Sequence, residues 1–525
     1  MTEKNKQKWN EILKFAVTVL TALLGALGVS AVLCAGLLSG CMLGPNYKKP
    51  ELDLPAAAEG EDFSIFENAQ WWEMFEDPEL NKLETEAVLY NRDLRQAVAR
   101  VDAARAAVGI AVADQVPTIA AQGGTGRAGN YYGSGQSLST GTIVASFELD
   151  LWGKYRRLSE AARADLLSTM AAKDTVLLSL TAQVASAYFM LRTLDAQLEI
   201  ANRTLQTRKE SVRIYTSRYN AGYITEVDLR RVEADMYSVA STAKSLELNV
   251  ATAETALAVL VGRSPREIVQ GSIERGAHLR DITLMPNVPE GIPSKLLANR
   301  PDVRSAEGQL IAANARIGAA RAAYFPDITL TGAAGYASPQ LNHLFRGPSG
   351  LWAFAGQLTQ PIFAGGAIVS QNKAAKAQYE QALAAYEKAV QVAFKETLDA
   401  LNSNRIHREI FEISKEQTQA LRRGYELTKK QEDAGLIGTM ELLDVERNLL
   451  QSEMNLATAR QNELVALIDL AKALGGGWDE KCGFGPYEQR VQEEKEAFDA
   501  ARAQAAQNAQ TQPPAQAEQP AAETK

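Results

Sequence analysis

The chain has few of the residues that build metal sites and disulfide frameworks. Its 525 residues include three cysteines and three histidines. No Cys-x-x-Cys pair and no His/Cys cluster with zinc-ligand spacing occurs. The sequence also lacks a Walker loop, a nucleophile elbow and a His-Glu-x-x-His run. We therefore predict that the chain is not an enzyme, holds no metal ion and needs no dissociable cofactor.

Excess positive charge is also missing. The chain has 55 Lys and Arg against 63 Asp and Glu, a net charge of −8 and a pI near 5.4. A partner as negative as DNA or RNA is therefore not expected. With 46% apolar and 22% charged residues, the chain is too polar for a multispan helical membrane protein and too long for one ordinary core.

The amino end has the pattern of an export signal. Four lysines precede residue 15, and no charged residue occurs from Phe15 to Gly40. The apolar stretch is also long enough for an uncleaved membrane anchor, and this alternative stays open. Leu38-Ser39-Gly40-Cys41 resembles the lipobox of bacterial lipoproteins.

The lipobox resemblance implies that residues 1–40 are a lipoprotein signal peptide and that Cys41 carries a diacylglycerol and an N-acyl chain. Two or more acyl chains anchor a protein stably, whereas one is marginal. Met42 follows the cysteine in place of the aspartate that retains many lipoproteins in the inner membrane. The resemblance thus implies an outer-membrane lipoprotein, with residues 41–77 as an extended, lipidated segment.

The remaining chain contains two tandem copies of one pattern. An offset of about 209 residues aligns Asp93-Leu94-Arg95 with Asp302-Val303-Arg304, and the offset later drifts to about 213. We place repeat 1 at 78–264 and repeat 2 at 294–476. The segment 265–293 between them is rich in proline, which disfavours helix, and is predicted to be a linker.

Each copy is predicted to contain a very long antiparallel helical hairpin. Residues from Lys154 to about Asn220 and from Ala367 to Glu432 are rich in helix formers and free of proline. Turns at Ala221-Gly222 and at 434–438 lead into second helices that return from Thr225 and Thr439. A plain coiled-coil rod would give the same helical pattern.

A short β-hairpin is predicted in each copy, at about 118–152 and 327–363. Phe147, Leu149 and Leu151 alternate with polar residues, and copy two repeats the pattern around Trp352. Four strands of this length cannot close a barrel in an outer membrane, where open sheet edges are not tolerated. The chain must oligomerise, and sequence arithmetic leaves eight strands in a dimer or 12 in a trimer.

Many ordered motifs in residues 41–478 resemble the TolC-type outer-membrane efflux proteins, specifically the lipoprotein subgroup that serves resistance-nodulation-division multidrug pumps. The motifs are Leu43-Gly44-Pro45-Asn46-Tyr47, Trp71-Trp72, Asp77-Pro78, Gly262-Arg263-Ser264-Pro265, Arg300-Pro301-Asp302-Val303-Arg304, Ile311 to Pro326, and Leu474-Gly475-Gly476-Gly477-Trp478.

The resemblance implies an α+β membrane protein that forms a homotrimer. Its 12-stranded outer-membrane β-barrel, with four strands from each chain, continues as a long periplasmic α-helical barrel. The implied function is a passive, gated duct that exports drugs or other small toxic compounds. The implied partners are outer-membrane lipid, a periplasmic membrane-fusion adaptor and an inner-membrane resistance-nodulation-division transporter. No nucleic acid is expected.

The resemblance also assigns roles to residues at the periplasmic end. The turns that dock the adaptor would be Ala221, Gly222, Tyr223, Ala434, Gly435 and Leu436. The inward ring that closes the duct would comprise Met440 and Asp444, which are four residues apart and so share a helix face. Gln431 and Glu432 stand where some relatives carry Arg-Tyr pairs that latch the closed end, so the latch contacts of this chain differ.

Two other functions remain alternatives. One is a structural coiled-coil protein held in the inner membrane by an uncleaved helix, and the other is a duct for type I protein secretion. The carboxyl-terminal segment 477–525 ends in a tail of Ala, Gln, Pro and Glu, which predicts disorder.

Overall fold

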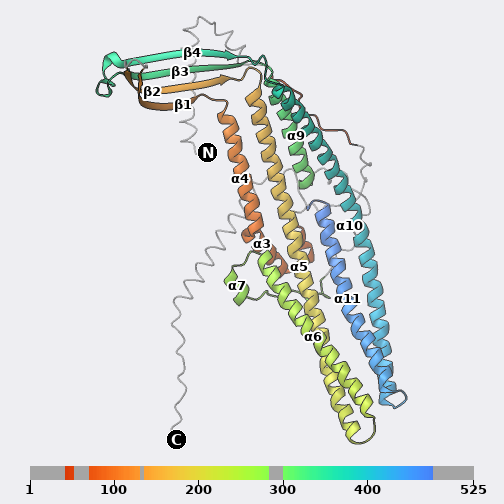
Figure 1. Ribbon diagram of the computed structural model, residues 1–525. Helices are drawn as coiled ribbons and strands as arrows, with labels where there is room; N and C mark the ends of the chain where they lie inside the picture. Colours follow the sequence, from red (N-terminus) through yellow and green to blue (C-terminus); the bar gives the residue numbers. More distant parts are fainter. Residues whose placement is uncertain (1–41, 53–69, 130–134, 283–299, 477–525) are drawn as a thin grey trace, which may run out of the picture. The chain divides into compact units, whose positions relative to one another are not determined.

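The computed structural model describes residues 42–52, 70–129, 135–282 and 300–476 (Figure 1). The predicted signal peptide 1–40, the lipid site Cys41 and the tail 477–525 lie outside these residues, as does 283–293 of the predicted linker. The elements are, in chain order, η2 (Trp71–Phe75), α3 (Pro78–Tyr90), α4 (Arg92–Ala113), β1 (Thr118–Gly129), β2 (Gly135–Leu149), α5 (Lys154–Asn220), α6 (Glu226–Leu260), α7 (Pro265–Gln270), α9 (Pro301–Ala322), β3 (Asp327–Ser338), η3 (Leu341–His343), η4 (Gly347–Ser349), β4 (Gly350–Thr359), α10 (Ala367–Asp433) and α11 (Thr439–Ala473).

The four strands form one antiparallel sheet in the order β1-β2-β3-β4, so the two hairpins pair through β2 and β3. Strands of 10 to 15 residues are long enough to cross an outer membrane when tilted. The prediction of four antiparallel strands combined with long helices is confirmed.

The register of the sheet gives it two chemically different faces. Residues opposite one another across paired strands lie on the same face. One face carries large apolar side chains, including Ile143, Phe147, Leu330, Phe354 and Trp352. The other carries Gln122, Thr140, Thr142, Thr329, Thr331 and Gln357. An apolar outer face and a polar inner face are what a barrel wall with a wet lumen requires.

Two pairs of long helices make up most of the chain. Helices α5 and α10 each have 67 residues, and α6 and α11 each have 35. In Figure 1 each pair runs antiparallel about a tight turn. Helix α5 holds one stretch that is long and apolar enough to cross a membrane, but 61% of that stretch is buried within the protein, as in a core helix.

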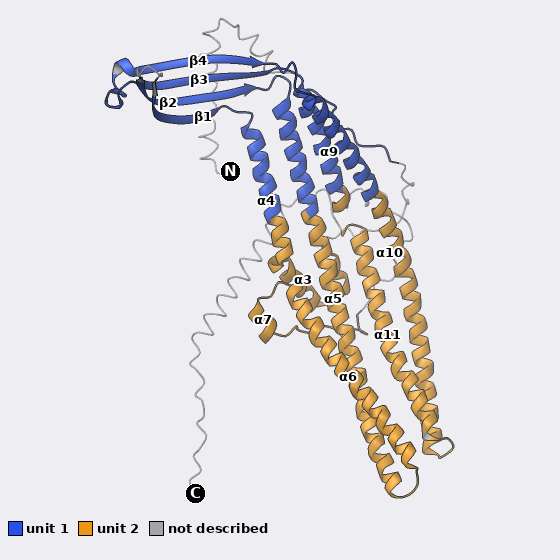
Figure 2. Ribbon diagram, viewed as in Figure 1, with its two compact units in different colours: residues 1–53, 99–172, 304–389 blue, residues 54–98, 173–303, 390–525 orange. Residues whose placement is uncertain are grey.

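The chain divides into two compact units that differ from the two sequence repeats (Figure 2). Unit 1 comprises 1–53, 99–172 and 304–389, and unit 2 comprises 54–98, 173–303 and 390–525. Each unit therefore takes segments from both repeats. The repeats are copies in sequence, but neither repeat corresponds to one compact unit.

Unit 1 contains the sheet and the segment that follows Cys41. The fully buried Arg157 of α5 donates hydrogen bonds to the carbonyl of Leu43 (3.0 Å) and to Asn46 Oδ1 (2.8 Å). Asn314 of α9 donates to the carbonyl of Pro45 (3.0 Å). These contacts hold the first described residues against α5 and α9.

Unit 2 contains the main hydrophobic core. The core gathers residues from η2, α3, α5, α6 and α11 around aromatic side chains. The ring of Phe75 packs edge-on against that of Phe189, with centroids 4.8 Å apart. The predicted tip turns extend from this unit, at the far ends of its helical hairpins.

Candidate functional site

The first tip turn joins α5 to α6. The N–H of Tyr223 donates to the carbonyl of Arg218 and that of Gly222 to Tyr219, both at 2.9 Å. Gly222 adopts a φ of +77°, a conformation that favours glycine, so the helix ends there. The turn leaves Tyr223 83% exposed. The predicted docking residues 221–223 therefore form an accessible tip.

The second tip turn joins α10 to α11 in the same way. The N–H of Leu436 donates to the carbonyl of Gln431 (2.8 Å), and Gly435 has a φ of +71°. Leu436 is 76% exposed. The tips thus share a backbone pattern, and each presents one large apolar side chain to solvent.

Glu432 connects the two hairpins close to these tips. Its Oε1 accepts hydrogen bonds from Tyr215 Oη (3.0 Å) and from Arg218 Nη1 (3.1 Å), both on α5. The Arg218 guanidinium also lies 5.2 Å from the centre of the Tyr215 ring. The sequence shows that Glu432 departs from the Arg-Tyr pairs of some relatives, but it does not show these partners. An acidic residue at this position indicates a basic or hydroxyl donor nearby.

A second contact between the hairpins lies further from the tips, on α5, α6 and α11. Asp235 of α6 pairs with Arg208 Nε of α5 (2.7 Å) and with Arg447 Nε of α11 (2.5 Å). Arg208 also pairs with Glu446 of α11. The Arg208 and Asp235 side chains are 1% and 3% exposed, and burial lowers the pKa of Arg208. Because an unpaired buried charge is strongly destabilising, each of these groups needs its ionic partner to remain buried.

A third contact centres on Glu453 of α11. One of its carboxylate oxygens pairs with Arg203 of α5 and the other with Arg422 of α10, each at 2.7 Å. We call the contacts of Glu432, of Asp235 and of Glu453 the ionic ladder. Its residues are Tyr215, Arg218 and Glu432; Arg208, Asp235, Glu446 and Arg447; and Arg203, Arg422 and Glu453.

The two residues predicted to close the duct lie beside the ladder but in different surroundings. Met440 is partly buried and packs against the apolar cluster of Tyr215, Leu229, Val232 and Leu443. Asp444 has a side chain that is 65% exposed, and its nearest cation is Arg447 Nη1 at 3.5 Å. Within one chain, then, the Asp444 side chain faces solvent, while Met440 packs with part of its surface against the contact between the hairpins. Their closing role stays a prediction.

Among the described residues no group of three or more His, Cys, Asp or Glu side chains is arranged to hold a metal ion. The tip region contains ion pairs and exposed apolar side chains, which suit reversible protein contacts.

Comparison with known proteins identifies the family. The family model "Outer membrane efflux protein" matches residues 84–263 and 292–476, once for each repeat. The chain belongs to the outer membrane efflux protein family. A second model, a family of unknown function (DUF6486), matches residues 4–32.

Relatives of this efflux protein match over most of their length. It is 33% identical to the probable efflux pump outer membrane protein TtgC of Pseudomonas putida, over 87% of this chain and 96% of the relative. It is also 33% identical to the cation efflux system protein CusC of Escherichia coli, over 84% of this chain and 97% of the relative. The solved CmeC outer membrane channel of Campylobacter jejuni superposes with a TM-score of 0.81 at 25% identity, covering 87% and 98% of the two chains.

These likenesses confirm the TolC-type fold with its two repeats, and this efflux protein is the outer-membrane channel component of an efflux pump, with a periplasmic helical part. The family consists of efflux proteins and not enzymes, in agreement with the sequence prediction.

Proposed function

We propose that this efflux protein is a lipoprotein attached through Cys41 and that three copies form one duct. The duct joins a 12-stranded barrel to a periplasmic barrel of helices. In a tripartite system it receives cargo through a membrane-fusion adaptor from a resistance-nodulation-division transporter. The observation that carries this proposal is the four-stranded sheet, because its end strands β1 and β4 pair on one side only within the described residues.

An unpaired strand edge cannot face lipid, since no water is available to its backbone N–H and C=O groups. Joining β4 of one chain to β1 of the next satisfies both edges by a rotation that closes a ring. Two chains would give a lumen filled with side chains, and three leave a water-filled passage. The row of Thr and Gln side chains on one sheet face fits the wet lumen.

Apolar residues along α10 support assembly. Ile406, Ile410 and Ile413 recur at helical spacing and are 39%, 41% and 65% exposed in the single chain. A stripe of this kind is stable when another helix covers it. In the proposed trimer the neighbouring chain supplies that helix.

We place the gate at the tips. Three copies of Asp444 would form a carboxylate ring that attracts cations, with Met440 as an apolar constriction. The ionic ladder would hold the hairpins together in the closed state. Adaptor contact at 221–223 and 434–436 would loosen them.

We expect the inner-membrane transporter to choose the cargo. The name of one relative states cation efflux, while another is described only as an efflux pump component. A passive duct with a polar lumen suits drugs, other small toxic compounds and cations alike. A type I secretion duct would share the architecture, but its loss would remove exported proteins from the medium without changing drug or metal susceptibility.

Single-channel conductance in planar bilayers tests the gate. Met440→Ala combined with Asp444→Ala should raise a small, flickering conductance and reduce cation preference. Met454→Ala combined with Glu441→Ala changes the same kinds of side chain on the same helix and should leave both properties as in the wild type. Equal conductance in the wild type and the gate variant would place the closure elsewhere.

Assembly and lipidation are tested together. The purified protein should migrate as a trimer in mild detergent without boiling and should incorporate labelled palmitate, and Cys41→Ser should abolish the label. A monomeric rod that retains residues 1–40 would instead support the alternative of an uncleaved inner-membrane anchor.

A further inference from the structure

Residues 272–282, which follow α7, form an irregular segment that we call the strap. It has no helix or strand of its own. Three of its apolar side chains, Ile273, Leu279 and Ile282, are only 3%, 5% and 3% exposed and belong to the main core of unit 2. The strap is thus an irregular segment fixed along its length.

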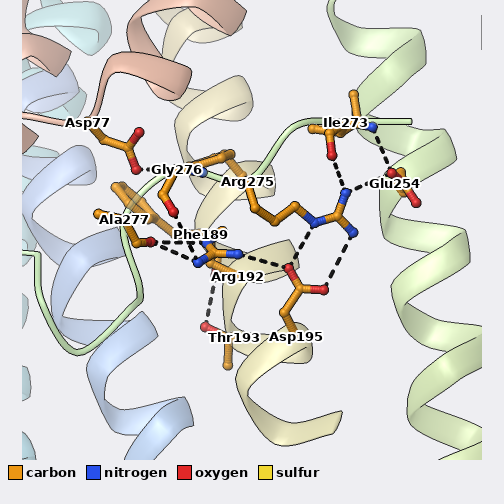
Figure 3. Close-up of polar contacts among 11 residues, drawn as sticks. Asp77, Phe189, Arg192, Thr193, Asp195, Glu254, Ile273, Arg275, Gly276 and Ala277 are labelled. Carbon is orange, nitrogen blue, oxygen red and sulfur yellow. Dashed lines mark hydrogen bonds and ion pairs between the residues drawn. The ribbon is translucent and has the colours of Figure 1, made fainter. Parts of the chain in front are cut away.

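Arg275 fastens the middle of the strap to both helices of the first hairpin (Figure 3). Its Nε lies 3.0 Å from Asp195 Oδ2 on α5, and its Nη1 lies 2.7 Å from Glu254 Oε1 on α6. The backbone N–H of Ile273 donates to the same Glu254 oxygen (2.7 Å). Arginine can bind two carboxylates at once because its planar guanidinium carries five donors.

A second arginine and a tyrosine hold the backbone beside Arg275. Arg192 Nη2 donates to the carbonyl of Ala277 (2.9 Å), and its Nη1 pairs with Asp195 (3.2 Å). The N–H of Gly276 donates to Tyr188 Oη (3.1 Å), which donates in turn to a carboxylate oxygen of Asp77 (2.7 Å).

Gly276 has no room for a side chain. A Cβ at this position would lie 2.1 Å from Oδ1 of Asp77, the N-cap of α3. The close fit anchors the strap to α3 as well as to α5.

The far end of the strap reaches the second hairpin. Arg460 of α11 donates a hydrogen bond to the carbonyl of Ile282. The same guanidinium pairs with Glu463 (2.7 Å) and lies 5.0 Å from the centre of the Phe411 ring on α10. One short segment therefore contacts α3, α5, α6 and α11, and through Arg460 it is tied to α10.

The strap contacts lie far from the tips along the helices. Asp195 lies 25 residues before the end of α5 at Asn220, about 38 Å along the helix. Every α5 residue of the ionic ladder, from Arg203 to Arg218, lies between Asp195 and that end. The strap therefore connects the two hairpins at a level farther from the tips than the ionic ladder.

We propose that the strap is a fulcrum: Arg275, Arg192 and Arg460 keep the two hairpins joined at this level, so that opening of the tips is confined to the helix segments beyond it. This inference rests on the proposed gated duct. The ladder contacts can then break during opening while the core around the strap stays packed. Arg275 acts as a positioning residue, since it touches no cargo.

Hydrogen exchange by mass spectrometry, combined with conductance, tests the fulcrum in the full-length lipidated protein. The variant is Arg275→Met, which keeps side-chain length and removes both ion pairs. The control is Arg405→Met, which removes an exposed arginine paired with Glu409 on α10. If Arg275→Met does not fold, Arg275→Lys replaces it, because lysine keeps the charge but lacks the planar guanidinium that binds both carboxylates.

We expect Arg275→Met to speed exchange in residues 272–282 about tenfold, as the loss of charged hydrogen bonds worth about 1.4 kcal/mol implies. Exchange should also rise in the helix ends 208–219 and 440–450, and conductance should increase. The control should match the wild type in all three. Faster exchange in the strap without any change in the helix ends would overturn the fulcrum, as would an unchanged strap.

The two proposals fail differently. If the wild type does not conduct at all, the gated duct is wrong. In that case exchange in 208–219 and 440–450 still shows whether the strap restrains the hairpins.

Discussion

The two repeats have helices of equal length but very different surroundings. Helix α5 contributes a dense series of buried residues, among them Val184, Tyr188 and Leu191, to a core shared with α3 and the strap. Along all of its length α10 buries only Asn372, Ala375, Tyr386, Ala393, Thr397, Ala400 and Thr418 within the described chain. Helix α5 is therefore packed by its own chain, whereas α10 presents a surface suited to neighbouring chains.

The largest effect should come from the buried contact where the repeats meet. Arg208→Met leaves the carboxylates of Asp235 and Glu446 with one cation fewer, at a site where Arg208 and Asp235 are almost fully buried. Breaking a buried pair from one side costs about 3–5 kcal/mol. Urea unfolding in detergent, followed by circular dichroism, measures the loss.

Arg213→Met is the matched control for Arg208→Met. Arg213 lies on the same helix, but its ion pair with Glu210 is exposed, so stability should not change. Equal stability of Arg208→Met and the wild type would show that the ladder does not hold the repeats together.

A pH dependence should arise in the first repeat. Glu84 of α3 is fully buried, and burial outweighs the opposing effect of the Ala185 backbone to raise the pKa of this carboxyl well above its usual range. The folded state therefore holds the neutral acid, while the unfolded chain ionises above pH of about 4.3. Stability should fall by about 1.4 kcal/mol for each pH unit between the unfolded and the folded pKa.

Glu84→Gln should remove this slope and stabilise the protein at neutral pH. Urea unfolding midpoints at pH 5, 6, 7 and 8 measure the slope of stability against pH. Glu73 is exposed, so Glu73→Gln is the control that should keep the wild-type slope. If Glu84→Gln retains the slope, the carboxyl is already ionised in the folded protein.

The smallest effect concerns the tips. Helix α6 begins with a capping box formed by Thr225 and Asp228, whereas the N-cap residue of α11, Gly438, provides no side-chain cap. Thr225→Ala should lower the stability of the protein by about 1 kcal/mol, whereas Gly438→Asp should raise it by a few tenths of a kcal/mol. Hydrogen exchange in the first turns of α6 and α11 measures both effects, and Gly438→Ala, which is a poorer N-cap than glycine, should instead speed exchange in the first turn of α11. Equal exchange rates in the first turns of α6 and α11 in the wild type would show that the capping box does not make the start of α6 more stable.

Local signals in the sequence were sufficient for the elements. Proline-free runs, the glycines at 222 and 435, and the alternation around Phe147 predicted the long hairpins and the strands because each depends on neighbouring residues. The described residues also include features that local patterns cannot show. Arg447 and Asp235 are 212 residues apart, and Arg192 and Ala277 are 85 apart, so no window of sequence contains both partners.

The site was predicted less completely than the fold. The tip turns followed from helix termination, and the roles of Met440 and Asp444 followed from resemblance. The strap lay in the segment predicted only as a linker. Its lack of helical or strand periodicity did not reveal that Arg275 is bound to carboxylates on two long helices.

The order of pairing in the sheet also bears on how the protein assembles. The hairpin of β1 and β2 closes over five residues, and that of β3 and β4 over 11, whereas β2 and β3 are separated by roughly 180 residues. Closing so long a loop costs about 4–5 kcal/mol of chain entropy, and such distant pairings form late. The helices α5, α6 and α9 lie within that loop. We expect folding of these helices to bring the two hairpins together, so that β2 and β3 pair after the helices have formed.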